Sequence, residues 1–115
     1  MITHRYTSKD GALVGKSGVY LGCIIKLSRY TSVTIGRDPQ LCDVVISSDC
    51  SKISRVHCTV SYDLANDVYL IHDMSANGTI IVDGNEKTMI KGQTTKAHSK
   101  SVLHLGDSTN SFELL

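Results

Sequence analysis

The sequence predicts an all-β domain, built as a sandwich or a barrel. Its apolar residues form short runs rich in Val, Ile and Thr, and turn residues such as Gly, Asn and Asp separate these runs. Many short strands joined by frequent turns are typical of both architectures. No window keeps an apolar stripe at helical spacing for three turns, which disfavours a large helix.

The first half of the chain contains four predicted strands. Residues 1–11 are polar and mixed in charge, so we expect a flexible lead-in before a domain that covers residues 12–115. A dense aliphatic run predicts the first strand, and the alternation of Val33 and Ile35 predicts the second. A short apolar run and a longer alternating run predict the next two. The four segments are Val19–Leu27, Ser32–Ile35, Val44–Ile46 and His57–Tyr62.

The second half contains four more predicted strands. The first is an aliphatic run, and the second follows an Asn-Gly pair, which favours a tight turn. The third ends at a Gly-Asp pair, and the fourth closes the chain. These segments are Val68–His72, Thr79–Val82, Val102–Leu105 and Phe112–Leu115. The polar stretch Lys91–Ser99 fits no strand pattern, and we assign it to a loop.

Size, charge and cysteine content limit the classes of function. The 115 residues correspond to one domain, and their net charge of +1 gives no global basic field for direct nucleic-acid binding. No stretch approaches the ~20 apolar residues that cross a bilayer. The four cysteines form no C-x-x-C pair, which favours reduced thiols in an intracellular protein over a disulfide or a metal site.

Two motifs suggest enzymes, but neither is complete. The Gly-Lys-Ser sequence at 15–17 resembles the end of a phosphate-binding P-loop, yet position 10, where that loop has a glycine, is Asp10. Ser54 and His57 are close in sequence, but no Gly-x-Ser-x-Gly elbow accompanies them. The histidines have no zinc-ligand spacing. We therefore predict that the domain is not an enzyme.

Four short motifs carry the functional signal by their order. They are Gly36-Arg37, Ser54-Arg55-Val56-His57, Asn77-Gly78-Thr79 and the pattern Leu-x-x-Gly-Asp over 103–107. Each is common alone, but this order on an all-β background resembles the forkhead-associated (FHA) domain. The resemblance covers roughly residues 12–115.

The resemblance implies a β-sandwich of about eleven mostly antiparallel strands that binds phosphothreonine peptides through loops at one end. Arg37 would contact the phosphate, Ser54 would donate its hydroxyl to it, and Asn77 would bond the peptide main chain. Arg55 would assist at the phosphate. Secondary roles fall to Lys52, Ala76 and Thr79, and structural roles at the site to Gly36, His57 and Gly78.

The resemblance also implies the partner. We expect a threonine-phosphorylated protein or peptide, with no cofactor, no metal, no membrane and no direct nucleic-acid contact. The isolated domain is expected to be monomeric and intracellular, in the nucleus more than in the cytoplasm. The alternatives are a phosphate-independent interaction sandwich, that is, a degenerate FHA domain, and a regulatory domain cut from a larger protein kinase.

Several residues retain a second interpretation. Arg37 could pair with Asp38 or Asp43 in a turn, and Ser54 could be a turn hydroxyl. The Asn77-Gly78-Thr79 triplet also fits a plain hairpin turn or a glycosylation acceptor. Ala76 stands where many family members carry a threonine, which removes one auxiliary bond to the peptide.

Overall fold

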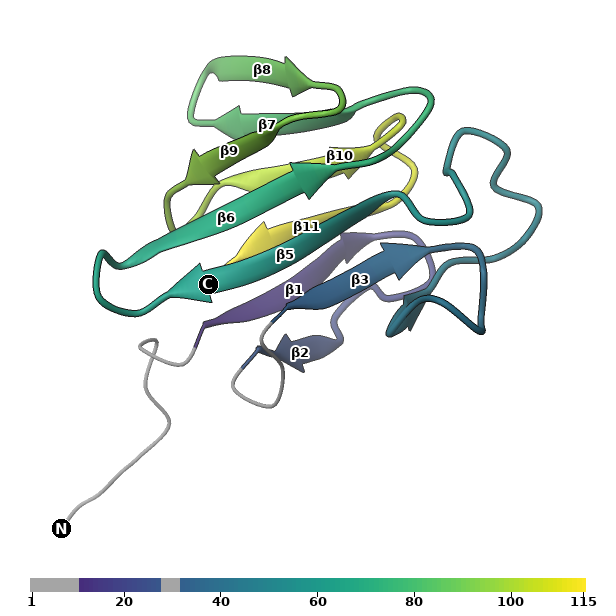
Figure 1. The fold of residues 1–115 in the computed structure, drawn as a ribbon, viewed down its shortest axis with the longest axis horizontal. Coiled ribbons are helices and arrows are strands. Elements are labelled where there is room, and N and C mark those ends of the chain that lie inside the picture. Colours follow the sequence, from purple (N-terminus) through teal and green to yellow (C-terminus); the bar gives the residue numbers. More distant parts are fainter. Residues whose placement is uncertain (1–10, 28–31) are drawn as a thin grey trace, which may run out of the picture.

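The computed structural model describes residues 11–27 and 32–115. Within these ranges the chain forms eleven strands in two sheets, mostly antiparallel, and no helix. Figure 1 shows how the strands are arranged. The predicted all-β sandwich is therefore confirmed. Apart from Gly11, the predicted lead-in lies outside the described residues. No helix that could cross a membrane occurs in the described ranges.

One sheet has six strands in the order β2-β1-β11-β10-β7-β8, and neighbouring strands pair antiparallel. A bulge in β1 shifts its register with β11 between Gly15 and Ser17. The strands are β1 (Ala12–Ser17), β2 (Ile24–Lys26), β7 (Thr79–Asp83), β8 (Glu86–Ile90), β10 (Val102–Leu105) and β11 (Ser111–Leu114).

The second sheet has five strands in the order β4-β3-β5-β6-β9. Its β3–β4 pair is parallel, and the other pairs are antiparallel. The strands are β3 (Val33–Gly36), β4 (Val44–Val45), β5 (Cys58–Asp63), β6 (Val68–Asp73) and β9 (Thr94–Ala97).

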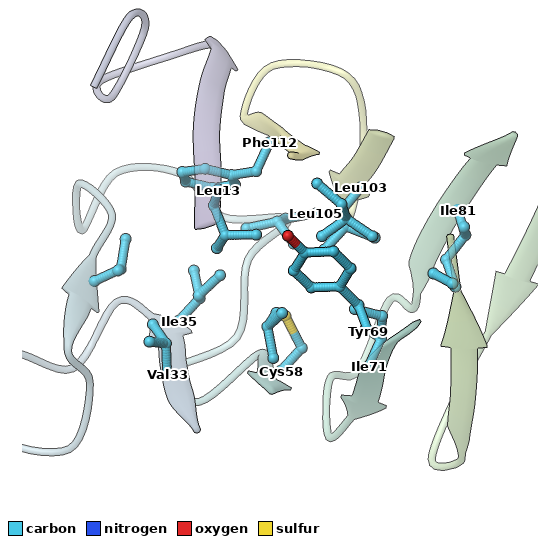
Figure 2. Packing of buried hydrophobic residues seen from close by; sticks show 14 of the residues in the cluster. Leu13, Val33, Ile35, Cys58, Tyr69, Ile71, Ile81, Leu103, Leu105 and Phe112 are labelled. Carbon is cyan, nitrogen blue, oxygen red and sulfur yellow. The ribbon is translucent and has the colours of Figure 1, made fainter. Parts of the chain in front are cut away.

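The core lies between the two sheets, where alternate residues of each strand point inward. The inward side chains of both sheets meet in one cluster (Figure 2). Tyr69 is fully buried there, and its hydroxyl accepts a hydrogen bond from the backbone N–H of Ala12 at 3.0 Å, which ties the sheets together. The labelled members from the six-stranded sheet are Leu13, Ile81, Leu103, Leu105 and Phe112, and those from the five-stranded sheet are Val33, Ile35, Cys58, Tyr69 and Ile71.

The prediction was wrong about the first strands. The segment Val19–Leu27 contains a strand only over Ile24–Lys26, and β1 lies earlier, at Ala12–Ser17. A turn occupies the residues between them, where the Leu21 N–H donates to the Gly18 carbonyl at 3.1 Å and the Cys23 N–H to the Tyr20 carbonyl at 2.8 Å. The aliphatic residues in this turn are exposed, so their apolar character does not report a buried strand.

The prediction was also wrong about Lys91–Ser99, which contains β9 at Thr94–Ala97. β8, at Glu86–Ile90, was not predicted either. Both strands lie at an edge of their sheet, and most of their side chains are exposed. Because an exposed edge strand needs no apolar face, its sequence lacks the alternation that identifies buried strands.

Four loops gather at one end of the sandwich, on the right in Figure 1, and we call this end the rim. They are the β3–β4, β4–β5, β6–β7 and β10–β11 loops. Backbone hydrogen bonds join them, among them Met74 N–H to the His57 carbonyl at 2.8 Å and Gly106 N–H to the Gly78 carbonyl at 3.2 Å. The C-terminus lies toward the opposite side of the sandwich.

Candidate functional site

The end of β3 and the segment before β5 are held together by their backbones. The N–H of Arg37 donates to the Ser54 carbonyl at 3.2 Å, and the N–H of Asp38 donates to the Arg55 carbonyl at 3.0 Å. At Gly36 an added Cβ would lie 2.2 Å from that Arg55 carbonyl oxygen, so only glycine permits this close approach. The fold thereby places Arg37 beside Ser54 at the rim.

The guanidinium of Arg37 is anchored by backbone carbonyls. Its Nε donates to the Ile53 carbonyl and its Nη1 to the Ser48 carbonyl at 3.3 Å. A guanidinium has five N–H donors, so these bonds orient the group and leave donors for a ligand. The nearby acids are engaged elsewhere, since Asp43 accepts from the Thr34 N–H and Asp38 faces Arg55. Arg37 is therefore not a turn arginine paired with either acid.

The Ser54 hydroxyl connects two loops of the rim. Its Oγ accepts a hydrogen bond from the backbone N–H of Ala76 at 2.9 Å, and the side chain is half-buried. An oxygen that accepts one bond keeps its own proton to donate. Ser54 therefore does act as a turn hydroxyl that accepts a backbone hydrogen bond. Its hydroxyl proton is still available to donate to a ligand at the rim.

His57 is fully buried and links three parts of the rim. Its Nδ1 accepts from the backbone N–H of Ser54 at 3.1 Å, and its Nε2 donates to the Gly78 carbonyl at 2.9 Å. These partners fix the neutral ring with its proton on Nε2. Burial lowers the pKa of His57, although the bond to Gly78 and the Asp73 carboxylate act in the opposite direction. Because the Nδ1 lone pair is occupied by backbone, His57 is not placed to deprotonate Ser54.

Asn77 stands on the β6–β7 turn and is exposed. Its Nδ2 donates to the Lys52 carbonyl at 3.0 Å, which orients the amide and leaves its Oδ1 as an acceptor. The next residue, Gly78, has φ of 90°, a conformation that favours glycine. The Asn-Gly pair therefore directs the amide toward the β4–β5 loop.

A buried carboxylate supports this turn from below. Asp73 is fully buried and accepts four hydrogen bonds, two from Ser75 at 3.1 and 2.7 Å, one from the Thr79 hydroxyl at 2.8 Å and one from the Gly92 N–H at 2.9 Å. The Ser75 hydroxyl in turn accepts from the Gly78 N–H at 2.7 Å. Burial by itself raises the pKa of Asp73, but these bonds outweigh it and hold the pKa below its usual value.

The sequence-based prediction placed Asp73 and Ser75 in the turn before Asn77 but gave them no role at the site. The signal was present, because an aspartate followed two residues later by a serine, before Asn-Gly, is typical of turns in which side chains bond nearby N–H groups. We call the residues His57, Asp73, Ser75 and Thr79 the supporting network.

Residues 33–106 match the family model of the FHA domain. The chain belongs to the FHA family. FHA domains are phosphopeptide-binding modules rather than enzymes. No curated protein matches this chain significantly.

Solved structures of other FHA domains have the same architecture. The FHA domain of the CT664 protein from Chlamydia trachomatis is 27% identical, with a TM-score of 0.74 over 91% of this chain and 95% of its own. An FHA domain solved in a study of phosphothreonine-dependent interactions is 25% identical, with a TM-score of 0.62 over 90% of this chain and 93% of its own.

A third structure contains a ligand. It is the MEK1 FHA domain in complex with a phosphothreonine peptide of HOP1, and it is 18% identical, with a TM-score of 0.69 over 92% of this chain and 95% of its own. At that identity the likeness concerns the fold. The four motifs on which the sequence prediction depends all lie at the rim or at the strand ends that enter it.

The secondary residues of this FHA domain lie at different depths. Lys52 and Ala76 are exposed at the rim, where the Lys52 carbonyl bonds Asn77 and the Ala76 N–H bonds Ser54. Thr79 is fully buried, and its hydroxyl belongs to the supporting network. Arg55 is exposed, with its Nη2 3.7 Å from a carboxylate oxygen of Asp38.

The P-loop-like sequence of this FHA domain lies in a strand. The Gly-Lys-Ser sequence at 15–17 lies within β1 and not before a helix, and Lys16 forms an ion pair with Glu113 at 3.4 Å. All four cysteines are free thiols. Among the described residues, no three His, Cys, Asp or Glu side chains gather in a group that could hold a metal ion.

Proposed function

We propose that this FHA domain recruits a signalling partner by binding a threonine-phosphorylated segment of it at the rim. In this proposal Arg37 and Ser54 bind the phosphate, Arg55 assists, and Asn77 bonds the peptide main chain. The proposal depends on one observation. Arg37 and Ser54 lie on backbone segments that are hydrogen-bonded to each other, and their side-chain hydrogen bonds leave N–H donors of Arg37 and the O–H donor of Ser54 unused.

The donors suit a phosphate ester. A phosphothreonine brings a charge of about −1.5 to −2 and three acceptor oxygens at neutral pH. Arg37 supplies a planar fork of donors with a permanent positive charge, and Ser54 adds a neutral donor beside it. Each hydrogen bond to a charged group contributes roughly 1.5–3 kcal/mol. Two or three such bonds offset the entropy of ordering a flexible peptide, which gives modest affinity that depends on the phosphate.

The position of Asn77 suits the peptide backbone. Its amide is held by the Lys52 carbonyl, so its free oxygen is oriented before a peptide arrives. An extended peptide presents N–H and C=O groups at every residue. A fixed side-chain amide can form hydrogen bonds with these groups whatever the sequence of the peptide. A threonine ester rather than a serine ester is supported by the similar FHA domains that are described with phosphothreonine ligands.

Direct titration tests the proposal. We would measure, by isothermal calorimetry or fluorescence anisotropy, the Kd of one peptide series that differs only at the central residue: phosphothreonine, phosphoserine, glutamate and threonine. We expect binding of the phosphothreonine peptides, weaker binding of phosphoserine and none of the other two, because glutamate has less charge and the wrong geometry. Equal binding of phosphorylated and unphosphorylated peptides would support the phosphate-independent alternative instead.

A further inference from the structure

Asn77 and Gly78 form a dipeptide that has a covalent chemistry of its own. In an Asn-Gly sequence the backbone nitrogen of the glycine can attack the side-chain carbonyl carbon of the asparagine, because glycine has no Cβ to obstruct the approach. Asn77 is exposed, and a glycine follows it. The other asparagines of the chain, Asn66, Asn85 and Asn110, are followed by aspartate, glutamate and serine.

The reaction is deamidation, and its only co-reactant is water. The Gly78 nitrogen loses its proton and forms a bond to Asn77 Cγ, while the bond from Cγ to Nδ2 breaks and Nδ2 leaves with that proton as ammonia. The product is a cyclic imide. Water then adds across one of the two C–N bonds of the imide, which leaves either aspartate or isoaspartate at position 77. Nothing is oxidised or reduced.

Two hydrogen bonds of the rim oppose this reaction. The Gly78 N–H, whose nitrogen is the attacking atom, donates to the Ser75 hydroxyl at 2.7 Å. The Asn77 Nδ2, which is the leaving group, donates to the Lys52 carbonyl at 3.0 Å. Attack requires the nitrogen to give up its proton and the amide to rotate, so both bonds have to break first.

The glycine is also fixed on its carbonyl side. The Gly78 carbonyl accepts from Nε2 of the buried His57 at 2.9 Å and from the Gly106 N–H at 3.2 Å. Both peptide groups of Gly78 are therefore held by other parts of the rim, and the residue cannot shift toward Asn77 by itself. The reaction should be slow in the folded protein and faster whenever this turn opens locally.

Conversion changes the charge and the shape of the proposed peptide site. An ionised aspartate has no N–H to donate, so the bond to the Lys52 carbonyl is lost and a carboxylate faces that carbonyl oxygen. The added negative charge lies at the rim, where the proposed ligand brings a phosphate with a charge of about −1.5 to −2. Isoaspartate also inserts a methylene into the main chain of the turn, which displaces the residues that follow.

We infer that Asn77 is a site of spontaneous deamidation, that its contact with Lys52 and the contact of Gly78 with Ser75 restrain the reaction, and that conversion inactivates the phosphopeptide site. The loss of binding rests on the proposed function, whereas the restrained chemistry does not. A bound peptide that bonds the Asn77 amide adds a further restraint, so an occupied domain is converted more slowly than an empty one.

Mass spectrometry measures the chemistry without any ligand. The protein is incubated at neutral and at mildly alkaline pH, either folded or unfolded in urea, and trypsin then releases residues 56–87 as one fragment. This fragment also contains Asn66 and Asn85 as internal controls. In the unfolded protein Asn77 should be converted faster than both controls, and faster at the higher pH, because attack needs the deprotonated nitrogen.

Folding should slow the conversion of Asn77 about tenfold or more, because two hydrogen bonds have to break before attack. Equal rates in the folded and the unfolded protein, or no conversion of Asn77 in either, would overturn the inference. This comparison needs no substitution, so it tests the restraint even if a variant of the rim fails to fold.

Two variants assign the restraint to the contact between Gly78 and Ser75. Ser75→Ala removes the acceptor and should raise the rate in the folded protein about threefold to tenfold. Thr79→Val is the matched control, because it removes another hydroxyl that bonds Asp73 but leaves the Gly78 N–H bonded. Its rate should stay within about twofold of the wild-type rate. Equal acceleration in both variants means that the rate follows the stability of the network, which contradicts the inference.

Peptide titration measures the consequence for binding. Ion exchange separates converted from unconverted protein by the added negative charge, and a phosphothreonine peptide is titrated into each. We expect the Kd to rise about tenfold or more on conversion, with a similar rise for Asn77→Asp. The same peptide, in excess during incubation, should slow the conversion of the wild-type protein.

The possible failures are distinguishable. An unchanged Kd after conversion overturns the inference and leaves phosphate-dependent binding intact. Failure of the unconverted protein to bind any phosphothreonine peptide overturns the proposed function, and the predicted inactivation with it. The rates from mass spectrometry decide the restraint on Asn77 in either case.

Discussion

The side chains at the surface of the rim and those of the supporting network beneath it come from the same loops but differ in how they are bonded. Arg37, Arg55 and Asn77 are half-buried or exposed, and each is oriented by the protein while keeping hydrogen-bonding groups for a ligand. His57 and Asp73 are fully buried, and all their partners belong to the protein, most of them at the rim and one, the Gly92 N–H, in the β8–β9 loop.

This difference separates two consequences of substitution. A surface side chain holds few neighbours in place, so its removal should change ligand binding more than stability. A member of the supporting network leaves buried donors without acceptors when it is removed, so its removal should change stability first. Substitutions at the surface of the rim and in the supporting network test whether the effects on binding and on stability can be separated.

The largest expected effect is on stability, from Asp73→Ala. The substitution leaves the Ser75 hydroxyl, the Thr79 hydroxyl and the Gly92 N–H without their acceptor. We expect a loss of about 3–5 kcal/mol in the free energy of unfolding, because several buried donors lose their partners together. Urea denaturation measures it, with the exposed Glu86→Ala as a control that should stay within about 0.5 kcal/mol. A small loss for Asp73→Ala would show that the network is dispensable.

The next effect is on binding, from Arg37→Ala. We expect the Kd of a phosphothreonine peptide to rise about 100-fold or more, since the charged fork is lost, while the free energy of unfolding changes by less than about 1 kcal/mol. Arg37→Lys keeps the charge without the fork and should fall between the two proteins. Peptide titration and urea denaturation of the same samples measure both quantities. If Arg37→Ala unfolds the domain, the surface and the network are not separable at this residue.

A smaller effect is the pH dependence that His57 brings to stability. Because its pKa is lower in the folded than in the unfolded protein, the unfolded state binds more protons below the ordinary histidine pKa of about 6.5. The contribution of the neutral ring is therefore fully present above that pH and is lost as the pH falls below it. The lowered pKa of Asp73 acts in the same direction, but only near and below the ordinary aspartate value of about 4.

Urea denaturation at several pH values between 7 and 5 measures this dependence. The difference in slope between the wild-type protein and His57→Asn isolates His57, because all other titrating groups are common to both proteins. Identical slopes would mean that the ring accepts a proton in the folded state as easily as in the unfolded chain.

The smallest effect is expected from Arg55→Ala. Its guanidinium is exposed, and its Nη2 lies 3.7 Å from Asp38, so the ion pair should contribute less than about 0.5 kcal/mol to stability. We expect the Kd of the phosphothreonine peptide to rise about twofold to fivefold, with a smaller change at high salt. Titration at two salt concentrations measures it. A loss as large as that of Arg37→Ala would make Arg55 a principal phosphate ligand.

Sequence patterns identified the buried strands better than the exposed ones. Strand β10 was predicted at its observed bounds, and β6 and β7 to within one residue, because each is an apolar run next to turn residues. β8 and β9 are edge strands with mostly exposed side chains, so nothing in their composition marks them. The run Val19–Leu27 failed for the opposite reason, since exposed aliphatic residues in a turn imitate a strand.

The sequence by itself determined the all-β class, the FHA family and the identity of Arg37, Ser54, Asn77 and His57 as rim residues. These features could be predicted because each motif consists of a few residues that are close together in the sequence. Only the tertiary structure decided which groups bond which. The contacts of Asp73 with Gly92, of Asn77 with the Lys52 carbonyl, and of Asn110 with Cys50 join residues that are 19, 25 and 60 positions apart. Such contacts depend on how two sheets pack and where their loops end, and no local pattern of side chains records that.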